Sequence, residues 1–246
     1  MARYKVVLAY DGTKFYGSQR QSEGRTVQAE FEKAIKQLGW QDRSVMLAGR
    51  TDAGVHASGQ VVSFDLDWVH ELVDLQRALN SLLPKDIAVR SITQVSADFH
   101  PRFDAISRCY HYHIHCDSVR DPLKLRYIWQ VWPPMELERL NAAAKILIGN
   151  HDFSAFGRAH RKNGSTIRSV IKAEWLQQGQ FYTFSITANA FLYHMVRRLV
   201  HVLVSVGQGN LNFATISDSL ETPSVSVHQG LAPPEGLELV EVCYPS

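Results

Sequence analysis

Segments with strand-like and helix-like periodicity follow one another along this chain in an order that restricts its fold to a few classes. In the first half, alternating apolar residues predict strands and a 3–4-residue apolar repeat predicts helices, in the order β-α-β-α-β. The second half has the order β-α-β-β-α-β, which matches the ferredoxin-like arrangement. The predicted strands are 3–10, 60–66, 87–95, 107–116, 166–177, 180–188 and 237–243, and the predicted helices are 26–39, 69–82, 134–147 and 191–206.

The chain is long enough for two domains of this kind. Its 246 residues are 45% hydrophobic and 20% charged, which is typical of ordinary globular proteins with a full core. We therefore expect an α+β protein of two ferredoxin-like or RRM-like α/β halves, with antiparallel or mixed sheets side by side and a central cleft. The expected domains are residues 1–104 and 105–246, of which the second would complete the cleft.

Charge, cysteine content and hydropathy exclude several classes of protein. No apolar run is long enough for a membrane span and no basic-then-apolar leader follows Met1, so we expect no membrane partner. Three cysteines without motif spacing are typical of reduced thiols, so we expect a cytoplasmic protein. The formal net charge of +2 is too small to identify a polyanionic partner, which must be inferred from local clusters.

The stretch Leu47–Leu66, LAGRTDAGVHASGQVVSFDL, combines a loop rich in glycine with a buried strand. Such a loop keeps side chains accessible on rigid scaffolding, and glycine supplies backbone conformations that other residues resist. Arg50, Asp52 and His56 lie in it, so a carboxylate flanked by an arginine and a histidine forms a candidate reactive centre. The alternative is an ordinary turn, which composition alone favours because Asp-Ala-Gly is common turn chemistry.

The predicted strand Ser107–Cys116, SRCYHYHIHC, places its histidines on one face. Histidines two residues apart can share a metal ion, but His111 and His115 would lie about 13 Å apart, too far for one ion. No carboxylate or cysteine pair nearby completes a ligand set. We therefore expect a solvated or hydrogen-bonded histidine face and no metal. Tyr110 lies on the opposite, apolar face, which should point toward a core or a cleft.

Between Asp152 and Glu174 the chain carries several cations and no acidic residue. These cations are Arg158, Arg161, Lys162, Arg168 and Lys172. An uncompensated basic loop with aromatic residues just ahead of it suits binding of a phosphate backbone. A solvated basic loop is the alternative, and the sequence leaves both interpretations open.

The segment FLYHMVRRLVHVLVSVG predicts a helix that is apolar over most of its circumference, so this helix should be central and largely buried. Arg197 lies outside the narrow polar stripe of the helix. A buried guanidinium keeps its proton and needs an acceptor, most economically a carboxylate. Alternatively, the side chain extends along the helix to water. The sequence leaves both possibilities open.

Five motifs occur in order along nearly the whole chain. They are YDGTKFYGSQRQ, GRTDAGVHA, AISRCY, FLYHMVRRLVHVLVSVGQG and APPEGLELVEV. Together they resemble the tRNA pseudouridine synthase A family, and GRTDAGVHA is far more specific than a lone glycine pattern. The resemblance outweighs the turn interpretation of Asp52, and it implies the pseudouridine synthase fold.

The resemblance also implies a function: isomerisation of uridine to pseudouridine in the anticodon stem-loop of tRNA, at positions 38, 39 and 40. It assigns Asp52 as the nucleophile, Tyr110 as a residue that packs on the target base and handles a proton, and Arg197 as the partner of the aspartate. Arg50 is implied to assist base flipping, and Leu237 to line the uracil pocket. The family implies no cofactor and no metal, and a homodimer whose subunits share the tRNA.

The chemistry of these residues agrees with the implied reaction, which breaks a C–N glycosidic bond, turns the uracil and joins its C5 to the same sugar carbon. An ionised carboxylate can attack uracil C6 or the sugar carbon, or assist deprotonation of the sugar, and the sequence leaves these routes open. A partner arginine would keep Asp52 ionised in a dry pocket, where isolation raises the pKa of a carboxyl. The target base must leave its stack, while the basic loop would grip the RNA backbone without reading sequence.

Three residues depart from the family pattern. Ser18 stands where a tryptophan is usual, Arg198 where an asparagine is usual, and His201 where a glycine is usual. The approach to the EGL segment, residues 222–231, also differs from the commonest form. These departures concern RNA docking more than the chemistry. A non-catalytic RNA-binding protein on the same scaffold is the competing function, and a metal-dependent hydrolase built on the histidine strand is a more distant one.

Overall fold

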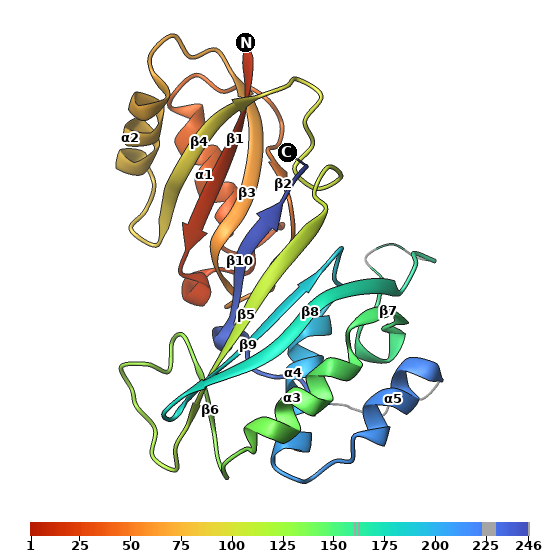
Figure 1. Cartoon of the computed structure of the whole chain (residues 1–246). Helices are drawn as coiled ribbons and strands as arrows, with labels where there is room; N and C mark the ends of the chain where they lie inside the picture. Colours follow the sequence, from red (N-terminus) through yellow and green to blue (C-terminus); the bar gives the residue numbers. More distant parts are fainter. Residues whose placement is uncertain (160, 162, 223–229, 246) are drawn as a thin grey trace. The chain divides into compact units, whose positions relative to one another are not determined.

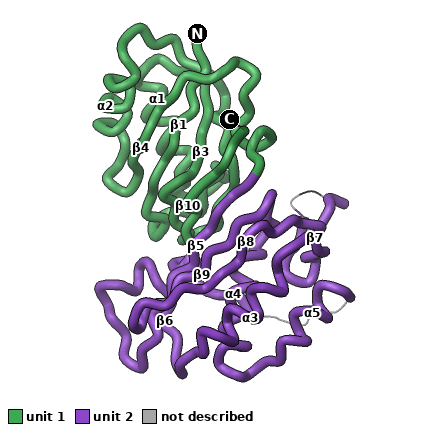
Figure 2. The backbone as a smooth tube through the Cα atoms, in the orientation of Figure 1, with its two compact units in different colours: residues 1–106, 238–246 green, residues 107–237 purple. Residues whose placement is uncertain are grey.

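The computed structural model describes residues 1–159, 161, 163–222 and 230–245. It contains two compact units, formed by residues 1–106 with 238–246 and by residues 107–237 (Figure 2). Each unit combines helices with a β-sheet (Figure 1), which confirms the expected α+β class. The division into domains 1–104 and 105–246 remains a prediction; among the compact units, residues 238–246 group with the first.

The first unit is built on a mixed sheet in the order β4-β1-β3-β10. Its strands are β1 (Ala2–Tyr10), β3 (His56–Leu66), β4 (Ile87–Val95) and β10 (Leu237–Cys243, in this unit from Glu238 on), with the short β2 (Met46–Leu47) beside β3. β1 is antiparallel to β3 and β4, whereas β10 runs parallel to β3. The predicted alternation of β1 is confirmed, because Tyr4, Val6, Leu8 and Tyr10 are buried.

Helix α1 (Val27–Lys36) begins where the sequence predicts. Thr26 has extended backbone and its Oγ1 accepts a hydrogen bond from the N–H of Ala29 at 3.3 Å, as expected of an N-cap. In Figure 1 this helix lies behind β1 and β3, and Phe31 meets Phe64 edge-on with ring centroids 5.6 Å apart. Helix α2 (Leu72–Leu82) begins later than residue 69, because Glu71 still has extended backbone.

The close approach of β10 to β3 requires a glycine at position 59. A Cβ on Gly59 would lie 1.9 Å from the carbonyl oxygen of Val240. Within the stretch 47–66, positive φ occurs at Gly54 alone, where it is 79°. The expectation that glycine supplies an unusual backbone conformation is therefore correct for Gly54, whereas Gly59 allows two strands to pack closely.

The second unit has a sheet in the order β5-β9-β8-β7, with β6 parallel to β5. Its strands are β5 (Ser107–Cys116), β6 (Trp129–Val131), β7 (Gly149–Asp152), β8 (Ile167–Gln178) and β9 (Phe181–Ala188). Its helices are α3 (Leu137–Ile146), α4 (Met195–Gly207) and α5 (Ala214–Glu221). The hairpin between β8 and β9 turns at Gly179, whose φ is 61°. Helix α3 packs against both β8 and α4.

Helix α4 is the largely buried helix that the sequence predicts. Apolar residues are buried on most of its surface: Met195, Val196, Leu199, Val200, Val202, Leu203, Val204 and Val206. It starts at Met195 rather than at residue 191, because His194 has left-handed backbone with φ of 64°. Arg197 lies in the first turn of this helix, among buried apolar residues of the same turn.

Candidate active site

The Asp52 loop, residues 48–55, joins β2 to β3 in the first unit. Thr51 is buried, and each of its three polar groups is hydrogen-bonded. Its N–H donates to Oγ of Ser18 at 2.8 Å, and its carbonyl accepts from the N–H of Ser18 at 3.1 Å. Its Oγ1 lies 2.8 Å from the hydroxyl of Tyr10. These contacts fix the peptide that leads into Asp52, which is half-buried.

The backbone that follows Asp52 is also fixed by hydrogen bonds. The carbonyl of Asp52 accepts a hydrogen bond from the N–H of Val55 at 3.2 Å, and the N–H of Gly54 donates to the carbonyl of Phe15 at 3.2 Å. The loop that contains Phe15 also packs closely against the Asp52 loop, because a Cβ on Gly17 would lie 2.8 Å from the carbonyl oxygen of Thr51. The Asp52 loop is therefore a rigid support for its carboxylate.

Two buried polar side chains support the start of the loop. Gln60 on β3 donates from Nε2 to the carbonyl of Gly49 at 3.0 Å, and its Oε1 accepts from the N–H of Gly49 at 3.3 Å. Burial raises the pKa of Tyr10 to about 12, so its hydroxyl stays protonated at neutral pH and keeps its bond with Thr51. Arg50, which directly follows this anchored glycine, is exposed.

His56 lies in the same stretch, at the start of β3, and is buried. Its Nδ1 accepts a hydrogen bond from the N–H of Gly12 at 3.0 Å, and Oδ1 of Asp11 lies 3.4 Å from the same nitrogen. A Cβ on Gly12 would lie 2.0 Å from the carbonyl oxygen of Val55, so the turn after β1 packs directly on the Asp52 loop. This histidine therefore fastens the end of β1 to the start of β3.

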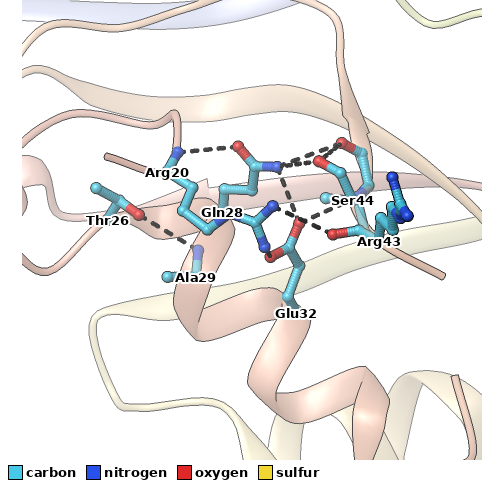
Figure 3. A network of polar contacts seen from close by, with 8 residues as sticks. Arg20, Thr26, Gln28, Ala29, Glu32, Arg43 and Ser44 are labelled. Carbon is cyan, nitrogen blue, oxygen red and sulfur yellow. Dashed lines mark hydrogen bonds and ion pairs between the residues drawn. The ribbon is translucent and has the colours of Figure 1, made fainter. Parts of the chain in front are cut away.

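The loop that faces the Asp52 loop, residues 15–20, is anchored to α1 through a buried glutamate (Figure 3). Glu32 accepts hydrogen bonds from Arg20 at 2.6 Å and from Gln28 at 2.9 Å. The N–H of Val45 donates to the same carboxylate at 3.1 Å. The N–H of Arg20 in turn donates to Oε1 of Gln28 at 2.9 Å. This network ties the facing loop to α1 and to the chain before β2.

Tyr110 lies on β5 in the second unit and is buried. Its ring meets Phe191 edge-on, with ring centroids 5.0 Å apart and an interplanar angle of 85°. Phe191 lies just ahead of α4, in the motif that also carries Arg197. Sequence reasoning missed this residue, because an aromatic residue in an apolar run carries no signal of which ring it will contact.

Arg197 is 9% exposed, so extension of its side chain into water does not describe its environment. Its Nε donates to the carbonyl of Ala232 at 2.7 Å, and the N–H of Ala232 donates to the carbonyl of Arg197 at 3.2 Å. The guanidinium therefore has a backbone acceptor within the second unit. A carboxylate partner remains a prediction, since Asp52 belongs to the other unit.

Leu237 is buried and follows a short 3₁₀ turn, Pro234–Gly236. The hydroxyl of Tyr112 donates to the carbonyl of Pro233 at 2.8 Å, and burial raises the pKa of Tyr112, which keeps the hydroxyl protonated. A Cβ on Gly236 would lie 2.7 Å from the Tyr112 ring. The segment that leads to Leu237 is thus packed on β5.

The predicted basic loop contains cations in different environments. Arg158 and Arg161 are exposed, and the guanidinium of Arg158 lies 5.1 Å from the centroid of a tyrosine ring just ahead of α4. Arg168 is half-buried and donates to the carbonyls of Ser165 and Ile167, at 2.9 Å and 2.6 Å. Arg168 lies on β8 rather than in a loop, and it supports the backbone where that strand begins. Lys162 lies outside the described residues.

The histidines of β5 are held by neighbouring side chains. Nδ1 of His113 lies 3.4 Å from Oγ1 of Thr183, and the rings of His111 and His113 are 6.1 Å apart. His115 is buried and stacks on Phe181, with centroids 4.8 Å apart. Within the described ranges, no three histidine, cysteine, aspartate or glutamate side chains gather in a way that could hold a metal ion.

His201, one of the departures from the family pattern, packs against Gly230. A Cβ on Gly230 would lie 1.8 Å from Nε2 of His201, so the imidazole occupies the space beside that backbone. The ring also stacks on Trp129, with centroids 6.5 Å apart and an interplanar angle of 18°. His201 lies one turn after Arg197 on α4 and therefore packs against the segment that holds the arginine.

We expect Gly230→Ala to lower the free energy of unfolding by about 2 kcal/mol, because the added methyl group must displace the imidazole of His201. In a His201→Ala background, the same change should cost less than about 0.5 kcal/mol, since the ring is gone. Urea denaturation of the four proteins in this cycle measures both values. Equal losses in the two backgrounds would show that the two residues do not compete for one space.

Comparison with known proteins identifies the class of this chain. A family model described as tRNA pseudouridine synthase matches residues 6–104 and 143–245, so the chain is a pseudouridine synthase by class. A tRNA pseudouridine synthase A of Salmonella arizonae is 39% identical over 98% of this chain and 90% of its own length. The chain therefore belongs to the tRNA pseudouridine synthase A family, a family of isomerases.

Two further relatives of the same name support this assignment. The protein of a Geobacter species is 35% identical over 100% of both chains, and that of Shewanella amazonensis is 40% identical over 99% of this chain and 93% of its own length. The resemblance inferred from the motifs, the expected fold class and the expectation of an isomerase are confirmed. No helix in the described ranges has the length and hydropathy that a membrane span requires.

Proposed function

We propose that this chain isomerises uridine to pseudouridine at positions 38, 39 and 40 of the tRNA anticodon stem-loop, with Asp52 as the nucleophile. The main structural support for this proposal is the set of hydrogen bonds that fixes the Asp52 loop. Because Thr51 is hydrogen-bonded at its N–H, carbonyl and hydroxyl, the next residue extends from a fixed backbone and stays half-buried. A preorganised carboxylate of this kind suits a reaction that demands accurate placement of the nucleophile.

The proposed reaction breaks the bond between uracil N1 and the sugar carbon, turns the base, and forms a bond from the same sugar carbon to C5. The proton on C5 is released to solvent and N1 takes up a proton, so the product is an isomer of the substrate. Asp52 can serve this reaction by attack on uracil C6, by attack on the sugar carbon, or by deprotonation of the sugar. All three routes need the carboxylate in its ionised form.

Arg197 is proposed to pair with Asp52 and to keep it ionised in a dry pocket, where burial alone would raise the pKa of a carboxyl. The buried position of Arg197 supports this role, because a guanidinium does not lose its proton in such surroundings. Tyr110 is proposed to pack on the target base, and its edge-on contact with Phe191 would hold the ring in place. That Arg197 and Tyr110 act on the same uracil as Asp52 is part of the proposal.

Arg50 and Leu237 are proposed to handle the flipped base. The target base must leave its stack, which costs a few kcal/mol, and an exposed arginine can fill the vacated space or hold a phosphate. The exposure of Arg50 beside Asp52 supports this role. Leu237 is proposed to line the uracil pocket as an apolar wall.

The RNA backbone is proposed to be held by the basic loop of Arg158, Arg161, Lys162 and Arg168, which would position tRNA without reading its sequence. The exposure of Arg158 and Arg161 supports this part of the proposal, whereas Arg168 would contribute less because it lies on β8 and bonds to the backbone where that strand begins. We further propose a cytoplasmic homodimer whose subunits share the tRNA and which needs no cofactor.

Release of tritium from C5-labelled uridine in unmodified tRNA, measured in excess chelator, tests this function. We expect release, followed by pseudouridine at positions 38, 39 and 40 when the product is mapped base by base. Binding of tRNA without release would favour the non-catalytic alternative. Release with pseudouridine at other positions would contradict the proposed site while leaving the reaction intact.

A further inference from the structure

Ser18 departs from the family pattern, and in this chain its side chain is hydrogen-bonded to Thr51, the residue before Asp52. It is 0% exposed, with α1 on one side and the Asp52 loop on the other. Its carbonyl accepts from the N–H of Gln28 at 2.9 Å, and its N–H donates to the carbonyl of Thr51 at 3.1 Å. Its hydroxyl accepts from the N–H of Thr51 at 2.8 Å.

We propose that Ser18 is a positioning residue for Asp52: its hydroxyl sets the direction of the Thr51 peptide and, through it, the place of the carboxylate. This inference rests on the proposed function of Asp52. It explains how a small polar residue serves at a position where a tryptophan is usual. A tryptophan side chain has a donor and no oxygen, so it cannot accept a hydrogen bond from the Thr51 N–H.

The hydroxyl of Ser18 matters because the Thr51 N–H is buried. In Ser18→Ala this N–H loses the acceptor that it has here, and the space left by one hydroxyl is too small for a water molecule. A buried donor without an acceptor is costly, so the peptide should turn toward another acceptor and move Asp52 with it. A displacement of about 1 Å at a reacting group can lower the rate about 100-fold.

Other contacts should keep the first unit folded when this hydroxyl is removed. The two backbone hydrogen bonds of Ser18 do not involve its side chain, and Thr51 keeps its bond to Tyr10. The network around Glu32 still anchors the loop that carries Ser18 to α1 (Figure 3). We therefore expect the loss to fall on kcat rather than on KM for tRNA or on folding.

The experiment compares Ser18→Ala with Ser63→Ala. Ser63 lies on β3 in the same unit and is also fully buried, but its Oγ has no hydrogen-bond partner in the part of the chain that the structure describes. Tritium release from tRNA gives kcat and KM, and amide hydrogen exchange reports on the Thr51 N–H. For Ser18→Ala we expect kcat to fall about 10- to 100-fold, with unchanged KM and faster exchange at Thr51. Ser63→Ala should match the wild type.

The outcomes separate this inference from the proposed function on which it rests. Wild-type kcat in Ser18→Ala, or an equal fall in both serine variants, would overturn the inference, while loss of turnover in Asp52→Asn would leave the proposed function standing. Turnover by Asp52→Asn would overturn both. If Ser18→Ala does not fold, Ser18→Cys takes its place: sulfur is a weak acceptor, so an intermediate kcat is expected and wild-type kcat overturns the inference.

Discussion

Replacing Asp52 with asparagine is expected to abolish pseudouridine formation while tRNA still binds. Asparagine keeps the shape of the side chain but is neutral, so it can act neither as the nucleophile nor as a base. Loss of a nucleophile typically lowers kcat by about 10⁴-fold or more. Tritium release at saturating tRNA measures turnover, and filter binding measures the affinity for tRNA, which should not change.

The matched control for this prediction is Asp67→Asn. Asp67 follows β3 in the same unit, its side chain is 85% exposed, and the substitution removes the same charge. We expect wild-type turnover from this variant, because a solvated acid at the surface does not take part in the chemistry. Turnover by Asp52→Asn would remove the assignment of the nucleophile, whatever the control does.

Replacing Glu32 with alanine is expected to lower the free energy of unfolding by about 3 kcal/mol. The buried N–H of Val45 would lose its acceptor, and such a loss costs about 1–3 kcal/mol. The Nε2 of Gln28 would lose one of its acceptors and keep its bonds to Oγ of Ser44 and to the carbonyl of Val45, and the removed side chain leaves unfilled space in the buried network. The side chain of Arg20 is 46% exposed, so its guanidinium can be hydrated and adds less to the loss. Urea denaturation at neutral pH measures the difference from the wild type.

Arg77→Ala is the control for the Glu32 variant. It breaks the ion pair between Arg77 and Asp74 on α2, whose groups are 3.3 Å apart and largely exposed. An exposed pair contributes little, so the loss should stay below about 0.5 kcal/mol. Similar losses in the two variants would show that the network around Glu32 is no more important than a surface ion pair.

The features that could be predicted from the sequence are those encoded by neighbouring residues. The start of α1 is set by Thr26, which bonds to an N–H three residues later, and the β8–β9 hairpin is set by Gly179 at its turn. The burial of α4 follows from its nearly continuous apolar surface. In each case, the signal and the structure lie within a few residues of each other.

The elements that the sequence does not predict are short or mixed in composition. β2, β6 and β7 contain 2, 3 and 4 residues, too few for a period of two to be recognised. α5 has 8 residues and only a few buried ones. These segments depend on partners elsewhere in the chain, as β2 depends on its pairing with β3.

The candidate site shows the same division. The GRTDAGVHA motif identifies Asp52 through its resemblance to a family, but a motif does not show what holds the aspartate in place. Ser18 and Thr51 are 33 residues apart in sequence, and their hydrogen bond exists only because two loops of the first unit meet. The contact of Tyr110 with Phe191 and the fit of His201 to Gly230 likewise join distant segments. One sequence does not reveal such pairings.

The position of β10 has a consequence for how the protein is made. This strand completes the sheet of the first unit, yet residues 107–237 separate it from the rest of that unit. The ribosome therefore synthesises the entire second unit before the strand that pairs with β3 emerges. Until then, the backbone groups at the start of β3, around His56 and Ala57, lack their partner strand, and unpaired strand edges attract strands of other chains. Because domains tend to fold in the order of synthesis, we expect the nascent first unit to wait with this edge exposed until β10 emerges.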